Sequence, residues 1–222
     1  MHTRFVFAGG FVLAWLGVFA GRAQAIVAGQ IDTFSSGAQN WATGASGNPS
    51  VTLGGGPGGA TDPFLQLVSD GSGPSGRLIE FNRAQWLGDY VAAGVTSIEM
   101  DITNIGSTPL DIRIAFKDTQ GFGGNGYAST TSFSLVNDGL WHHVAFGLSA
   151  SDLTAVGSPT PLGTFLTNPQ EFRILSSSSP ALNGDFLMAK LGVDNVTAVP
   201  APAGALCVGL GALVASRRRR TR

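Results

Sequence analysis

Apolar and polar residues alternate with a period of two along several short segments of the chain, as half-buried β-strands require. The clearest segment is 98–103, in which Ile, Met and Ile alternate with Glu, Asp and Thr. Residues 110–116 repeat the alternation with Leu, Ile, Ile and Phe, and the intervening segment 104–109 is rich in turn-forming residues. We therefore predict an antiparallel hairpin with one continuous apolar face.

Weaker alternation elsewhere, with breaks that mostly hold Gly, Pro, Asn or Asp, extends the same picture. One short helix is predicted at 83–93, although Gly88 would weaken it. About ten short strands with little helix predict an all-β, two-sheet antiparallel sandwich of the jelly-roll type, either concanavalin-like or galactose-binding-like. The weaker strands are predicted at 64–68, 77–81, 129–136, 141–147, 171–175 and 186–196.

The chain begins with the parts of a secretion signal. Arg4 precedes an apolar or glycine run from 5 to 20, and Ala23-Gln24-Ala25 offers the small residues at which a signal peptidase cuts. The run is shorter than the roughly 20 apolar residues that span a bilayer. We predict a helical signal peptide over 1–25 that is cleaved after Ala25. The alternative is a membrane helix that stays uncleaved.

The C-terminal segment 199–222 combines two prolines, an apolar stretch from 203 to 215 and a basic cluster. The prolines lack the N–H that a helix interior or a central strand needs, so we expect a break in regular structure there. As a helix, the apolar stretch would rise about 20 Å at ~1.5 Å per residue, short of the ~30 Å bilayer core. We predict a weak stop-transfer anchor whose arginines stay on the cytoplasmic side. The proline segment is Val199, Pro200, Ala201 and Pro202, and the anchor ends in Arg217, Arg218, Arg219 and Arg220.

A short proline motif, an apolar helix and a terminal arginine cluster, in this order, resemble the PEP-CTERM sorting signal. Ala201 stands where that family has a glutamate. The resemblance implies that 199–222 is a sorting tail handled by an exosortase-type enzyme, after the translocon and signal peptidase have acted. It also implies an intermediate tethered to the inner membrane, followed by a location in the cell envelope or extracellular matrix.

Between these ends, 26–198 is expected to form one domain. All 14 acidic residues of the protein lie in it, together with only six basic ones, an excess of eight negative charges with His neutral. Such a domain repels phosphate backbones, so we expect no nucleic-acid partner. The single cysteine, Cys207, lies in the predicted tail, which excludes a disulfide or thiolate chemistry from the domain.

Two short segments resemble sandwiches of the laminin-G and carbohydrate-binding-module type: Asp32-Thr33-Phe34 near Trp41, and the Gly-Val-Asp-Asn-Val sequence at 192–196. This resemblance implies an extracellular polysaccharide as partner. The residues with side chains suited to sugar contact are Trp141, His143 and Tyr127, because Trp141 and His143 share a strand face and Tyr127 follows a glycine-rich loop.

His142 and His143 are adjacent and therefore point to opposite faces of a strand, so they cannot chelate one metal ion together. His142 is in phase with apolar residues and is expected to be a buried, hydrogen-bonded imidazole. Asp32 and Asp194 would be neighbours if the first and last strands pair, and two carboxylates suit a structural Ca²⁺ ion, which takes about 6 to 8 oxygen ligands. Apart from this calcium pair, we predict no cofactor.

Catalytic signatures are weak. Glu99 and Asp101 share one strand face, but glycosidases of the concanavalin-like class carry a further Glu there, where this chain has Thr103. A hydroxyl does not exchange protons near neutral pH as such an enzyme requires. Residues 121–126 spell G-x-G-x-x-G, but a strand rather than a helix is predicted after them, so they do not form a dinucleotide site. We predict a protein that is not an enzyme and has no catalytic residues.

The sequence therefore predicts an exported protein of the cell envelope or extracellular matrix. Its sandwich would bind a glycan weakly or act as a scaffold. The alternatives are a glycoside hydrolase or lyase of the same fold, and a passive surface protein without a ligand.

Overall fold

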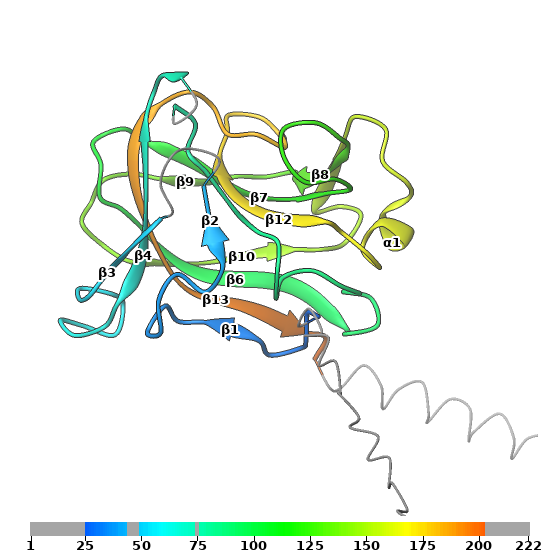
Figure 1. The fold of residues 1–222 in the computed structure, drawn as a ribbon, viewed down its shortest axis with the longest axis horizontal. Helices are drawn as coiled ribbons and strands as arrows, with labels where there is room; N and C mark the ends of the chain where they lie inside the picture. The colour runs from blue at the N-terminus through cyan, green and yellow to red at the C-terminus, as the bar shows by residue number, and fades with distance from the viewer. Residues whose placement is uncertain (1–24, 44–48, 74–75, 203–222) are drawn as a thin grey trace, which may run out of the picture.

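The structure, a computed structural model, describes residues 25–43, 49–73 and 76–202. These residues fold into two antiparallel β-sheets packed face to face, which confirms the predicted all-β sandwich (Figure 1). The expected signal helix and anchor helix, including Ala23 and Arg217 to Arg220, lie outside the described residues. Within the described ranges, no helix is long and apolar enough to cross a membrane.

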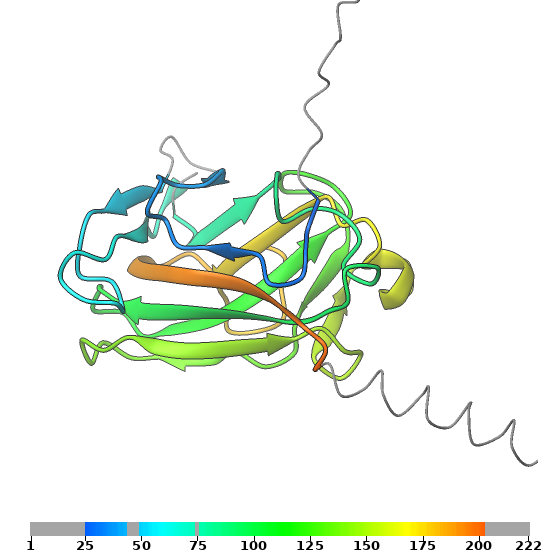
Figure 2. The ribbon, with the colours of Figure 1, turned by 90° about the horizontal axis from the view of Figure 1, so that it is seen from below.

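The first sheet, named sheet A here, is built around the long last strand of the domain. β1 (Ile31–Asp32) pairs with that strand, β13, beyond the end of β4, so the first and last strands are neighbours as expected (Figure 2). In spatial order, sheet A contains β10 (His142–Gly147), β6 (Val95–Asn104), β13 (Met188–Pro200), β4 (Phe64–Asp70) and β3 (Ser50–Thr52).

The second sheet, sheet B, has β7 and β12 at its centre. The short strand β9 (Phe133–Leu135) pairs with β7 beyond the end of β8, and the short helix α1 (Leu162–Phe165) lies between β11 and β12 in the chain. In spatial order, sheet B contains β11 (Leu153–Val156), β8 (Gly126–Ser129), β7 (Leu110–Lys117), β12 (Glu171–Ser176), β5 (Ile79–Asn82) and β2 (Trp41–Ala42).

The core between the sheets consists of the alternate apolar residues of the facing strands. Each large apolar side chain contributes about 1.5–3 kcal/mol when it is removed from water. Phe172 on β12 packs against Trp86 and Phe116, with ring centroids 5.2 and 5.0 Å away. The central strands β6 and β7 contribute Ile98, Met100, Ile102, Ile112, Ile114 and Phe116, all fully buried.

The predicted hairpin of 98–103 and 110–116 is wrong, because β6 belongs to sheet A and β7 to sheet B. Alternation shows which side chains enter the core, but two strands that face each other across the core have the same alternation as two paired strands. The crossing segment is held by Asn104, whose amide donates to the carbonyls of Thr108 and Leu135 and whose oxygen accepts the Gly106 N–H.

Three further predictions of local structure need correction. Residues 83–93 form turns instead of a helix, and Gly88 adopts φ +118°, a conformation that a helix does not contain. Of the strand predicted at 129–136, only Ser129, the last residue of β8, and Phe133–Leu135, which form β9, lie in strands. Pro200 lies in β13 after all. It ends the strand at a register shift opposite Val95, where a missing N–H is tolerated.

Candidate functional site

The outer face of sheet A carries a polar cluster that includes one of the predicted glycan contacts. His143 on β10 lies with Nδ1 3.0 Å from Asp101 Oδ1 and Nε2 3.3 Å from Glu99 Oε2, both on β6. The contact with Asp101 raises the pKa of the His143 imidazole, and Glu99 adds to this rise. Glu99, Asp101 and His143 thus form an ion-pair cluster on the outer face of sheet A.

Asp194 on β13 stands opposite Asp101 in the same sheet. A register shift follows at Asn195, which has φ +51° as β-bulge residues often do, and its amide donates to Asp101 Oδ2 at 2.8 Å. Asp194 is only 1% exposed, and its Oδ2 has no hydrogen-bond partner among the described residues. Burial raises the pKa of Asp194 to about 7, with Asp62 and Asp101 adding to the rise.

Trp141 lies on the same outer face, as its spacing from His143 predicted. Its indole N–H donates to the Gly55 carbonyl at 3.0 Å, and its ring stands edge-on to Phe64, with centroids 5.2 Å apart. Gly192 on β13 leaves room for the ring, because a Cβ there would lie 3.1 Å from Trp141 Cη2. The half-buried indole is thus seated in the surface of the sheet with its polar group already bonded.

Tyr127, the third predicted glycan contact, is not near the other two. It lies on β8 in sheet B, is 9% exposed, and packs edge-on against Phe165 with its hydroxyl donating to the Thr160 carbonyl. His142 agrees better with expectation. It is half-buried, and its Nε2 lies 2.9 Å from Asp138 Oδ2.

The predicted calcium pair, Asp32 and Asp194, is not brought together either. Asp32 is opposite Val196, a core residue, so its side chain faces inward while that of Asp194 faces outward. Its Oδ2 accepts the indole N–H groups of Trp41 and Trp86, each at 2.7 Å. No group of three or more His, Cys, Asp or Glu residues in the described part of the chain is arranged to hold a metal ion.

The outer face of sheet B is covered by two loops. The loop 118–125 joins β7 to β8, and the loop 177–187 joins β12 to β13. Beneath these loops, a second apolar cluster forms on the outer side of the sheet. The cluster consists of Ile79, Ala115, Ala128, Leu175 and Leu182.

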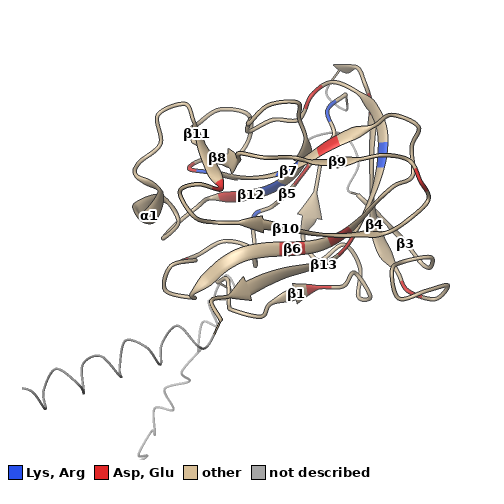
Figure 3. Cartoon of the chain, turned by 180° about the vertical axis from the view of Figure 1, so that it is seen from behind, with Lys and Arg blue, Asp and Glu red and all other residues tan. Residues whose placement is uncertain are grey.

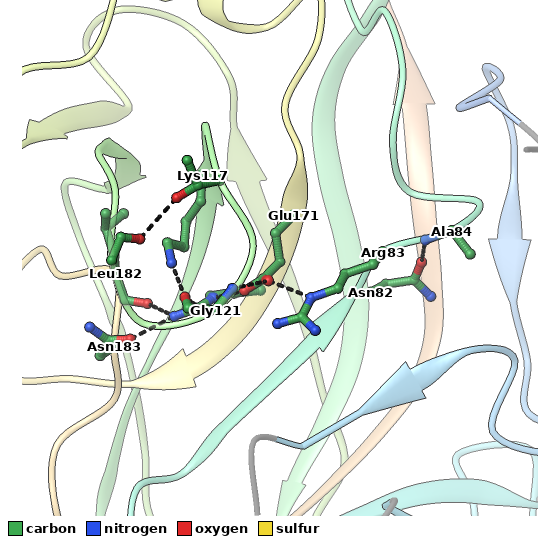
Figure 4. A network of polar contacts seen from close by, with 11 residues as sticks. Asn82, Arg83, Ala84, Lys117, Gly121, Glu171, Leu182 and Asn183 are labelled. Atoms are coloured by element: carbon green, nitrogen blue, oxygen red, sulfur yellow. Dashed lines mark hydrogen bonds and ion pairs between the residues drawn. The ribbon is translucent and has the colours of Figure 1, made fainter.

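Next to this cluster, a polar network joins Arg83, Arg173 and Lys117 to Glu171 and Gly121 (Figure 4). Glu171, which is fully buried, accepts Arg83 Nε at 2.6 Å and also bonds Arg173 and the Gly121 N–H. Lys117 and Arg173 both donate to the Gly121 carbonyl, which ties the loop 118–125 to the sheet. Burial, with Arg173 nearby, lowers the pKa of Lys117 to about 8.

A cavity of about 280 Å³ opens beside this network. The Arg83 guanidinium lies over the Phe81 ring at 3.9 Å from its centroid, and Phe122 on the loop 118–125 is 63% exposed. Exposed rings and guanidinium groups in one hollow can stack on sugar rings and donate hydrogen bonds to their oxygens. We call this hollow the sheet B cleft; its lining residues are Thr43, Ile79, Phe81, Arg83, Gly121, Phe122 and Arg173.

Sequence patterns did not identify this cleft, because its residues come from distant segments. Pairing of β5 with β12 places Arg173 opposite Phe81, although they are far apart in the chain. One signal was available: Arg113 and Arg173 each lie between two apolar residues of a predicted strand, in a domain with few basic residues. Figure 3 shows basic segments on β7 and β12, and acidic segments on many other strands and loops.

The fold is an antiparallel two-sheet β-sandwich. No protein-family model matches the sequence, and no curated protein is similar to it. The chain is similar to the family 11 carbohydrate-binding module of a cellulosomal cellulase of Clostridium thermocellum, with 16% identity over 79% of this chain and 96% of that chain and a TM-score of 0.48.

Two further structures are similar. A family 11 module from Clostridium thermocellum in complex with a β-1,3-1,4-mixed-linked tetrasaccharide has 18% identity, covers 79% of this chain and 99% of that chain, and has a TM-score of 0.48. An exo-β-agarase has 12% identity over 79% of this chain and 25% of that chain, with a TM-score of 0.51. At these identities the similarity concerns the fold alone.

Proposed function

We propose that the sandwich binds a glycan, without catalysis, and that the sheet B cleft holds it. The observation that carries this proposal is the combination of an exposed aromatic ring, Phe122, with the guanidinium of Arg83 in one cavity. Saccharides present apolar C–H faces beside hydroxyl groups, so a site that recognises them needs both kinds of group. Trp141 on the opposite sheet is the alternative site, because it is the aromatic residue of the outer-face cluster.

A glycan array with the full-length protein in mild detergent, followed by calorimetry on the best binder, tests the proposal. We expect Phe122→Ala to weaken binding about tenfold, because the ring lost is exposed and worth roughly 1.4 kcal/mol of stacking. Trp141→Ala should leave binding unchanged. The reverse result would move the site to the outer face of sheet A. If the protein binds no neutral or acidic polysaccharide on the array, the remaining functions are those of a scaffold or a passive surface protein.

Catalysis has no support in the arrangement of the acidic residues. Glu99 and Asp101 both contact His143, and Thr103 on the same face has no ionisable group. We therefore expect the wild-type protein to cleave no bound glycan, and replacement of Glu99 by Gln to make no difference. Loss of a measurable hydrolase or lyase activity in that variant would favour the enzymatic alternative.

We further propose that the protein is exported through a signal peptide over 1–25 and sorted through its PEP-CTERM-like tail at 199–222. The order of the sequence parts supports this, and so does the position of the described ends. Ala25 and Pro202, which border the two expected signals, are both exposed at the surface of the sandwich.

Intact mass spectrometry of the protein recovered from the envelope of its host tests the export proposal. We expect a mature N-terminus at Ile26 and a C-terminus shortened or modified within 199–222. An unmodified 222-residue chain in the cytosol would contradict both expectations.

A further inference from the structure

We propose that the glycan bound in the sheet B cleft carries carboxylate groups, as a polyuronate does; this inference rests on the proposed glycan-binding function. The first argument is charge. The domain has an excess of acidic residues, yet the two charged residues that line the cavity are Arg83 and Arg173. Lys117 lies fully buried behind them.

The positive charge is not fully compensated from within the protein. Glu171 is the carboxylate at the centre of the network, and its oxygens already accept bonds from Arg83, Arg173 and the Gly121 N–H. Asp118, at the margin, is bonded to Asn125. A buried excess of cationic groups is costly in a medium of low polarity, so a bound anion is favoured over a neutral group.

Arg83 is held in a geometry suited to a carboxylate. Its Nε donates to Glu171 and its plane lies over Phe81, which together fix the direction of the guanidinium. Its two terminal nitrogens make no hydrogen bond with the described residues, and the side chain is 33% exposed (Figure 4). A fixed guanidinium fork with free N–H groups matches the two oxygens of a carboxylate.

The size of the cavity limits what enters it. Its volume of about 280 Å³ lies just below the roughly 300–1,000 Å³ of sites that enclose drug-sized ligands. One sugar unit with its carboxylate fits this volume better than several units. The rest of a polysaccharide would then lie along the surface beside Phe122.

Calorimetry with oligouronates, the same oligosaccharides after carboxyl reduction, and a neutral β-glucan tests the inference. The full-length protein should bind the oligouronate, and carboxyl reduction should weaken binding about tenfold or more. Arg83→Gln should cause the same loss for the oligouronate only, and Arg83→Lys, which keeps the charge but not the fork, a smaller one. Arg77→Gln is the matched control, because Arg77 also lies 3.9 Å over a Phe ring but outside the cleft.

The outcomes separate the two proposals. Equal binding of the reduced and native saccharides, with no effect of Arg83→Gln on the preference, would overturn the carboxylate inference and leave glycan binding intact. Preference for a sulfated neutral glycan over every oligouronate would also overturn it. Absence of binding to all of these saccharides would overturn the proposed function itself. Thermal melts that match the wild type establish that each variant is folded.

Discussion

Replacement of Asp194 by Asn should stabilise the protein, by an amount that grows as the pH rises from about 4 to about 7. The Asp194 side chain is 1% exposed, and its Oδ1 accepts the Asn195 N–H at 2.8 Å while its Oδ2 lacks a partner among the described residues. Asn preserves the accepting oxygen and the shape of the side chain but cannot ionise. The substitution therefore removes a buried charge, and the new amide can donate to the neighbouring Asp62 carboxylate.

The magnitude follows from the pKa of Asp194, which burial raises to about 7. In the unfolded chain the group has a pKa of about 3.9, so the folded state binds the proton more tightly. The resulting stabilisation is complete below about pH 4 and is lost as the pH rises toward 7. The full difference is about 4 kcal/mol at roughly 1.4 kcal/mol per pKa unit, an upper bound for the gain in Asp194→Asn at pH 8.

Urea denaturation of the full-length protein at pH 4.5 and pH 8 measures the effect. We expect the variant and the wild type to differ by about 1 kcal/mol or less at the lower pH, and by several times more at the higher one. Asp70→Asn is the control, because Asp70 also accepts a backbone N–H but is exposed. A variant that is less stable than the wild type at pH 8 would refute the reasoning, since the carboxylate would then have a stabilising partner such as a bound cation.

Two substitutions in the core test the buried acids there by urea denaturation. Asp32→Ala should lower the free energy of unfolding by about 3 kcal/mol or more, because the indole N–H groups of Trp41 and Trp86 lose their acceptor. An unchanged free energy of unfolding would contradict this role of Asp32. Glu80→Met should raise it by about 1–3 kcal/mol, because both Glu80 oxygens lack partners among the described residues and burial raises the pKa of this group. Destabilisation by Glu80→Met would indicate a partner for the carboxyl.

Period-two alternation predicted most strands because it reports burial, which is a local property of the sequence. Pairing is not local. Sheet A contains β6 and sheet B contains β7, yet each has the apolar pattern expected of hairpin strands. The same limit applies to side chains that reach a site. The sequence correctly placed Trp141 and His143 on one strand face. The direction of the Tyr127 side chain depended on where the preceding loop ends, because β8 begins at Gly126 and its next residue, Tyr127, points into the core.

The direction of the basic side chains on sheet B could be predicted in part from the sequence. Their hydrogen bonds to the covering chain explain the shape of the sheet B cleft. Arg113 lies between two core residues on β7, so its side chain must leave on the outer side of the sheet. There it donates to the carbonyls of Ser177 and Ser129, as Lys117 and Arg173 donate to that of Gly121. Each buried cation is thus satisfied by backbone oxygens of the chain that covers it, which fixes the loops over the sheet. Arg83 differs because its terminal nitrogens bond no backbone oxygen among the described residues, and this difference makes Arg83 available to a ligand.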